Sequence, residues 1–291
     1  MTPMETRSQS RTEHVRRKLL QRTTWAVRRA TAAQRVLPDF LILGAMRSGT
    51  TSFYDYVCQH SRVPPAFKKE IRFFDRHLAE GLDWYRAHFP LARHLLGRAR
   101  QMGGRALTGE ATPYYLFHPD VPRRVQEHLP QARFIVLLRN PVDRAYSHHA
   151  HQLARGREPL PFAEACAREE ERLRGETEHL AADPHYRSEC HRRQSYLARG
   201  RYAEQLERWF ARFPRERFLI LQSEWFFGEP QAAMDAACRF LELPEFVVTP
   251  HPATNAQKYP RLSADVRREL EEYYAPHNAR LRALLGREFD W

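Results

Sequence analysis

Lysine is scarce in this chain of 291 residues. Only Lys18, Lys68, Lys69 and Lys258 are lysines, so 43 of the 47 basic residues are arginine. Against 35 acidic residues they leave a formal net charge of +12, which favours anionic ligands such as nucleotides, nucleic acids, acidic glycans or anionic lipids. In so lysine-poor a chain, the pair Lys68-Lys69 beside Glu70 indicates positions where lysine is used for its chemistry.

Cysteine is also rare, and the four present, at positions 58, 166, 190 and 238, show no C-x-x-C spacing. This pattern argues against a dense disulfide framework and a cysteine metal site, and it suits free thiols in a reducing compartment. Long apolar runs are missing as well. No stretch offers the ~20 apolar residues of a membrane span or the apolar region of a signal peptide. These absences predict a cytoplasmic protein.

The first 36 residues hold nine Lys or Arg and two Glu, so they carry +7 of the +12. We interpret residues 1–36 as a basic extension and residues 37–291 as a single domain, because a chain of this length with 42% hydrophobic residues can bury a full core. The extension is either solvated or packed on the domain, or it forms a basic amphipathic helix in peripheral contact with an anionic membrane. Charge runs are commonly solvated, which favours the first alternative.

The apolar segment at residues 40–44 leads into a loop with the spacing of a phosphate-binding loop, Gly-x-x-x-x-Gly followed by two hydroxyl residues. Thr50 stands where an NTPase needs a lysine, which argues against ordinary ATP or GTP hydrolysis. What remains is an anion cradle at a helix N-terminus. Arg47 lies inside the loop, where a guanidinium can neutralise an anion or a leaving oxygen. The cradle residues are Ser48, Gly49, Thr50 and Thr51.

A second apolar segment, residues 133–138, ends at Arg139, and Asn140-Pro141 is typical of a helix cap followed by a first helical residue. Ser147 would lie roughly 9 Å further along that helix, at ~1.5 Å rise per residue. Arg139 and Ser147 can together bind a second, separate phosphate. Because parallel strands end at the same edge of a sheet, the two segments predict a nucleotide with two separated phosphates.

These segments resemble the donor site of PAPS-dependent sulfotransferases of the carbohydrate, heparan-sulfate-like type, in a bacterial-style version. In that family the first loop holds the 5′-phosphosulfate of 3′-phosphoadenosine-5′-phosphosulfate (PAPS), and an Arg…Ser pair holds its 3′-phosphate. Residues 69–75 resemble the segment that carries the family's catalytic glutamate, and residues 109–115 resemble its acceptor-lining strand. The resemblance covers nearly all of residues 39–291.

The resemblance implies a sulfotransferase that moves a sulfuryl group from PAPS to a hydroxyl or amine by positioning and electrostatics, without a metal. Glu70 would remove the acceptor proton, while Arg47 and Lys69 would stabilise the leaving phosphate. The other implied contacts are Ser48, Gly49, Thr50, Thr51, Arg139, Ser147, Tyr202, Lys258 and Tyr259 for the donor, and Arg72, Glu110, Thr112 and Tyr114 for the acceptor.

Three departures from the family's pattern affect these roles. Arg47 replaces the usual lysine, which keeps the charge but exchanges a compact ammonium for a planar fork. Arg72 replaces a histidine, so it can bind an anionic acceptor but cannot shuttle a proton. Residues 254–257 replace the family's gate over the nucleotide, which leaves Lys258 and Tyr259 for that role. The acceptor stays open; the resemblance favours a carbohydrate, a glycolipid or a natural product.

Strands alternate with helices along the chain, which predicts an α/β fold: a P-loop-like parallel sheet in one domain, with helices on both faces. The predicted strands are residues 40–44, 106–109, 133–138 and 218–221. The predicted helices include residues 119–129, 141–155, 162–182, 202–213 and 230–241, one opening at Ser263, and a last one ending near Gly286.

Two other function classes remain at this point. A P-loop nucleotide kinase would need magnesium and ATP, but the loop lacks the required lysine. A nucleic-acid-binding protein is suggested by charge alone, because no recognisable nucleic-acid module or aromatic motif is present. We therefore expect no specific nucleic-acid partner.

Overall fold

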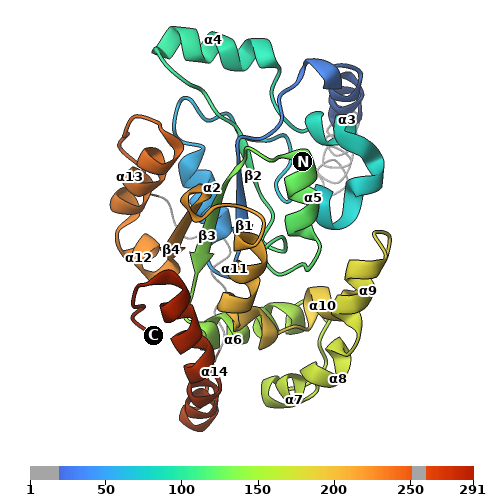
Figure 1. The fold of residues 1–291 in the computed structure, drawn as a ribbon, viewed down its shortest axis with the longest axis vertical. Coiled ribbons are helices and arrows are strands. Elements are labelled where there is room, and N and C mark those ends of the chain that lie inside the picture. The colour runs from blue at the N-terminus through green and yellow to red at the C-terminus, as the bar shows by residue number, and fades with distance from the viewer. Residues whose placement is uncertain (1–19, 251–259) are drawn as a thin grey trace, which may run out of the picture.

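A four-stranded parallel sheet with the strand order β2-β1-β3-β4 forms the centre of the molecule (Figure 1). The computed structural model describes residues 20–250 and 260–291. The strands are β1 (Phe40–Gly44), β2 (Gly109–Ala111), β3 (Arg133–Leu138) and β4 (Phe218–Gln222). Strands β1 and β3 are almost wholly buried, because a parallel sheet covered on both faces requires continuous apolar segments.

Helices cover both faces of this sheet, so the predicted fold class is confirmed. Residues 20–30 form the first helix that the structure describes. The longer α-helices are α2 (Thr50–Val57), α4 (Ala92–Met102), α5 (Val121–His128), α6 (Pro141–Leu153), α11 (Tyr202–Phe210), α13 (Pro230–Leu241) and α14 (Ala264–Leu285). The shorter ones are α3 (Gly81–Arg86), α7 (Phe162–Ala167), α8 (Glu169–Leu173), α9 (Glu176–Ala182), α10 (Glu189–Arg193) and α12 (Ser223–Gly228). A π-helix covers Phe73–His77, and 3-10 turns cover Ala32–Gln34, Leu78–Glu80, Ala198–Gly200 and Arg215–Arg217.

Alternate residues of the central strands pack into two separate apolar layers, one on each face of the sheet. Leu41 and Phe134 pack on one face with Trp209 of α11. Phe40 and Ile135 pack on the opposite face with side chains of α2 and α13. The same alternation runs along all the buried strand residues. The sheet is therefore held from both sides while its carboxyl edge stays available for loops.

The predictions for β1 and β3 are confirmed residue for residue. The short second strand begins three residues later than predicted, at Gly109, because Thr108 is already engaged: its amide bonds to the Asp39 carboxylate at 2.9 Å and its hydroxyl to the Pro64 carbonyl at 2.9 Å. Glu110 then pairs beside Leu41 inside the sheet, although a carboxylate in a buried strand is not expected from sequence.

Two predicted helical stretches are divided differently in the structure. Residues 162–182 form three short helices instead of one, with a break at Gly175, whose φ is 76°. Conversely, the two helices predicted between Ser263 and Gly286 are one, α14, which continues through Pro276. The predicted end is confirmed, because Gly286 has a left-handed φ of 65°.

Candidate active site

The loop between β1 and α2 has the backbone of an anion cradle. Gly49 is the N-cap of α2 and has a φ of 81°, and a Cβ added there would lie 2.7 Å from the Phe227 ring. Only glycine fits this position without strain. Helix geometry leaves the amides of Thr50 and Thr51 without partners inside α2. The amide of Ser48, by contrast, already donates to the Ala45 carbonyl at 3.2 Å, and its contact with the donor stays a prediction.

The side chain of Ser48 is fully buried, and its Oγ has no hydrogen-bond partner among the described residues. A buried hydroxyl normally finds a partner. An anion seated on this loop would supply one, so the residues present fit the predicted ligand.

The loop after β3 lies directly beside the first one. Arg139 Nη1 donates to the Arg47 carbonyl at 3.0 Å, and Arg47 Nε donates to Ser147 Oγ at 3.0 Å. Asn140 caps α6 by accepting from the amides of Val142 and Asp143, as the sequence predicts. Three of the predicted donor contacts therefore come together at the carboxyl edge of two neighbouring strands.

Tyr202 supports Arg139 from the interior of the protein. Its ring is buried, and its hydroxyl donates to the Arg139 carbonyl at 2.8 Å. This bond holds Arg139 in place, and a contact between Tyr202 and the nucleotide stays a prediction. Lys258 and Tyr259 lie outside the described residues.

A third loop, which sequence analysis missed, joins the same edge. Ser223 at the end of β4 donates to the Ser48 carbonyl at 3.0 Å, and Glu224 accepts from the Asn140 amide at 2.9 Å. Helix α12 carries two exposed aromatic side chains, Trp225 (39% exposed) and Phe227 (46%), of which Phe227 lies against Gly49. The signal was a Trp-Phe-Phe run directly after an apolar strand.

The segment with the predicted reacting groups lies beside α2. The Ala66 amide donates to Tyr54 Oη at 2.8 Å. Lys69 is half-buried, and burial lowers the pKa of its ammonium, opposed by the charges of Asp55 and Glu70. Glu70 is exposed and has a φ of 50°, a region that residues other than glycine rarely occupy. Such backbone strain concentrates at functional sites.

Arg72 is held by a carboxylate at the start of the π-helix. Its Nε and Nη2 donate to Asp75 Oδ2 at 3.0 and 2.5 Å. Burial raises the pKa of Asp75 even though the Arg72 charge lowers it. The Arg72 amide bonds to Thr112 Oγ1 at 3.3 Å, which ties this segment to the strand β2.

Glu110 and Thr112, which the sequence predicts as acceptor contacts, are buried and hydrogen-bonded inside the protein. Glu110 is 1% exposed and accepts hydrogen bonds from Tyr85 (2.6 Å), Thr112 (2.8 Å) and Tyr115 (3.1 Å). Thr112 is equally buried and bonds to Glu110 and to the Arg72 amide. These bonds make both residues internal supports of the site, and their contact with an acceptor stays a prediction.

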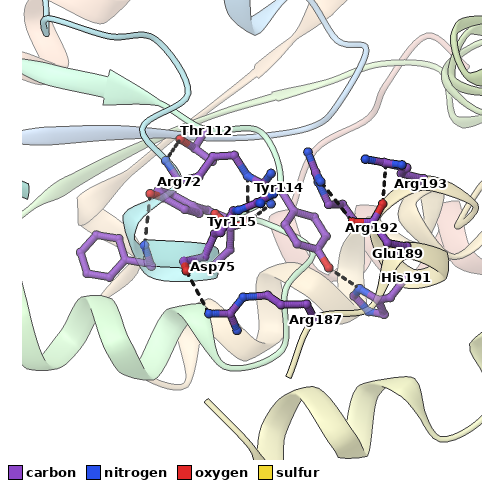
Figure 2. Close-up of polar contacts among 12 residues, drawn as sticks. Arg72, Asp75, Thr112, Tyr114, Tyr115, Arg187, Glu189, His191, Arg192 and Arg193 are labelled. Atoms are coloured by element: carbon purple, nitrogen blue, oxygen red, sulfur yellow. Dashed lines mark hydrogen bonds and ion pairs between the residues drawn. The ribbon is translucent and has the colours of Figure 1, made fainter. Parts of the chain in front are cut away.

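A cavity of about 250 Å³ lies beside Arg72 and Asp75, whose contacts are drawn in Figure 2. Arg72 and Tyr114 line it as predicted for acceptor contacts. Tyr114 hydrogen-bonds His191 Nδ1 at 2.8 Å. The other lining residues are Asp75, Arg76, His77, His118, Leu180, Arg187, Ser188, Glu189 and Arg192. With four arginines against two carboxylates, the cavity favours an anionic ligand.

Arg199, which sequence analysis did not single out, lies between this cavity and the first loop. Its guanidinium is buried over the rings of Tyr114 and Phe117, at 4.9 and 4.8 Å, and reaches the Met46 sulfur at 3.4 Å. Burial lowers the pKa of Arg199 to about 9. No local feature distinguishes Arg199 from the many other arginines of the chain.

A family model described as the sulfotransferase domain matches residues 37–268. The chain belongs to the sulfotransferase family. It is 26% identical to the membrane-associated sulfotransferase kil1 of Dictyostelium discoideum, over 88% of this chain and 66% of that protein. It is 28% identical to the human heparan sulfate glucosamine 3-O-sulfotransferase 6, over 89% of this chain and 75% of that protein. The human bifunctional heparan sulfate N-deacetylase/N-sulfotransferase 3 is 27% identical, over 86% of this chain and 30% of its own length.

The structure also resembles a solved sulfotransferase, that of Alicyclobacillus acidocaldarius. The TM-score is 0.65 at 31% identity, over 87% of this chain and 98% of the other. The predicted family and the enzyme class, a transferase of sulfuryl groups, are thus confirmed, and the nucleotide-kinase alternative is excluded.

Within residues 20–250 and 260–291, no three or more His, Cys, Asp or Glu side chains cluster as metal ligands. No helix in the same part of the chain combines the length and the apolar character needed to cross a bilayer.

Proposed function

We propose that this sulfotransferase uses PAPS as its donor. The observation that carries the proposal is the meeting of Arg47 in the first loop, Arg139 after β3 and Ser147 on α6 through hydrogen bonds of 3.0 Å. A loop with free amides at a helix start suits the 5′-phosphosulfate. Arg139 and Ser147 suit a second phosphate that is separate from the first. The exposed rings of Trp225 and Phe227 offer a surface on which the adenine base can stack.

In the proposed reaction the chain supplies charge and position. Arg47 and Lys69 stabilise the negative charge that develops on the leaving 5′-phosphate. Half-burial makes the Lys69 ammonium effective, because its charge is less screened than at an open surface. Glu70 accepts the proton of the acceptor's hydroxyl or amine.

We further propose an anionic carbohydrate as the acceptor. The arginine-rich lining of the cavity supports this class of ligand, as do curated relatives whose names include heparan sulfate. Arg187 and Arg192 reach the cavity from the loop before α10 and from α10 itself. Their guanidinium groups can pair with carboxylate or sulfate groups.

Calorimetry with three nucleotides tests the donor. In the presence of a chelator, the protein should bind adenosine 3′,5′-bisphosphate at least tenfold more tightly than adenosine 5′-monophosphate, because only the former has a second phosphate for Arg139. Equal affinity for the two would overturn the assignment of the second phosphate site. ATP binding that requires magnesium would refute the donor proposal altogether.

Transfer of ³⁵S from labelled PAPS tests the acceptor. N-sulfated heparosan should become labelled and dextran, a neutral polysaccharide, should not. Substitution of Arg187 by Ala should raise the KM for heparosan while leaving the KM for PAPS unchanged. The exposed Arg155, which lies outside the cavity lining, provides the matched Arg155→Ala control. Equal labelling of both polysaccharides would contradict an anionic acceptor.

We propose a cytoplasmic location, with a basic extension at residues 1–36 and a sulfotransferase domain at residues 37–291. The four cysteines are free thiols, which supports a reducing compartment. Peripheral contact between the extension and anionic membranes is a related proposal, supported by the charge of +7 and by the relative named as membrane-associated. Co-sedimentation with phosphatidylserine vesicles, compared with neutral vesicles, checks it.

A further inference from the structure

We infer that the helix over residues 20–30 is a brace that fixes the loop carrying Lys69 and Glu70. The inference rests on the proposed function in treating these two residues as the reacting groups. The sulfotransferase family match begins at residue 37, so the brace lies outside the matched segment. In Figure 1 this helix, in dark blue, lies beside α3.

Trp25 makes the central contact. Its ring is stacked on Phe67 with a centroid distance of 6.0 Å, and it also meets His88 at 4.6 Å and Trp84 at 6.0 Å. Phe67 precedes the Lys68-Lys69-Glu70 sequence directly. Phe67 is 42% exposed, and its ring contacts with Trp25 and with Arg28 both come from this helix.

Arg28 fixes the same helix to the domain. Its guanidinium lies 4.7 Å from the centre of the Phe67 ring. It donates from Nε to the Ala87 carbonyl at 2.6 Å and from Nη2 to the Phe89 carbonyl at 2.7 Å. The Phe67 amide donates to the neighbouring His88 carbonyl at 2.7 Å. The brace and the start of the loop are therefore held by the same short segment, residues 87–89.

The loop needs such support because it is strained. Glu70 and Arg72 have φ values of 50° and 61°, and such conformations persist only where the surroundings enforce them. The far end of the loop is held by the bond from the Arg72 amide to Thr112. The near end is held at Phe67. Without the Trp25 ring, the near end would keep only the Arg28 contact and the backbone bonds of Ala66 and Phe67, so the position of Lys69 and Glu70 would vary more while the donor loops stay unchanged.

Hydrogen exchange on the full chain tests this inference with Trp25→Ala. Amides in residues 67–72 should exchange about fivefold faster, as expected for the loss of one aromatic pair. The affinity for adenosine 3′,5′-bisphosphate should stay within twofold. With N-sulfated heparosan as the probe, kcat should fall about tenfold at an unchanged KM for PAPS. Trp25→Phe should restore both exchange and kcat, because it keeps a ring on Phe67.

Val27→Ala is the matched control, since Val27 lies on the same helix and is exposed; it should exchange like the wild type. Unchanged exchange of residues 67–72 in Trp25→Ala would overturn the brace. Equally faster exchange in α13 would overturn it as well, because Trp25 would then stabilise the whole fold. A wild type that fails to sulfate heparosan would contradict the acceptor proposal alone, because the exchange measurement needs no turnover.

Discussion

Glu110 offers the sharpest test of the internal polar network, through the substitution Glu110→Gln. Burial raises the pKa of this carboxyl to about 7, and it outweighs the lowering effect of the hydrogen bonds from Tyr85, Thr112 and Tyr115. An amide can keep these contacts: its oxygen can accept from both tyrosines, and its NH₂ can donate to the Thr112 hydroxyl. The substitution therefore removes the ionisation while leaving the packing nearly intact.

The direction of the pH effect on stability follows from the linkage between proton binding and folding. A carboxyl whose pKa is higher in the folded than in the unfolded chain stabilises the fold fully below its unfolded pKa, and this stability is lost as the pH rises through the folded pKa. Between the ordinary value of 4.5 and about 7, the loss amounts to about 3 kcal/mol. Most of this loss should appear between pH 5 and pH 8.

Thermal denaturation of both proteins across this pH range measures the effect. The melting temperature of Glu110→Gln minus that of the wild type should increase by roughly 5 °C or more from pH 5 to pH 8. Using this difference cancels the titration of the buried histidines, which both proteins share. If the melting temperatures of the two proteins change in parallel from pH 5 to pH 8, burial does not raise the pKa of Glu110, and the prediction is refuted.

Three further substitutions test the donor site and the base. Arg139→Ala should abolish the preference for a 3′-phosphorylated nucleotide, seen as equal affinities by calorimetry. Glu70→Gln should lower kcat by about 100-fold with unchanged bisphosphate binding; a fully active variant removes Glu70 from the mechanism. Gly49→Ala should lower the melting temperature and weaken nucleotide binding, because the new methyl group meets the Phe227 ring; wild-type behaviour would contradict the cradle geometry.

The sequence predicts best those features whose residues lie within one short continuous segment of the chain. The strands at residues 40–44 and 133–138 are recognisable because each is an apolar run that ends in a turn and a helix start. The order of these segments along the chain then brings both loops to one edge. Arg139 and Arg47 could therefore be expected to meet before any coordinates were known.

Glu110 could not be placed in the same way. In sequence it belongs to a polar stretch beside two tyrosines, which is typical of a ligand-contacting turn. Its burial depends on Tyr85, which lies in helix α3, and on the pairing of its own strand β2 with β1. Long-range partners of this kind decide whether a carboxylate is a support or a contact, and residue spacing does not reveal them.

The contrast between donor and acceptor sides has a physical cause. The proposed donor site consists of backbone amides, caps and strand ends, whose positions follow from local rules of helix and strand formation. The cavity is assembled from a π-helix, the loop before α10 and α10 itself, where arginines from separate segments converge. Because those side chains are free to differ without disturbing the sheet, acceptor choice can change while the donor site is kept. Substitutions at Arg187 and Arg192 should therefore alter which polysaccharide is sulfated and leave the affinity for adenosine 3′,5′-bisphosphate unchanged. If these substitutions reduced polysaccharide sulfation and bisphosphate affinity together, the donor and acceptor would share one site.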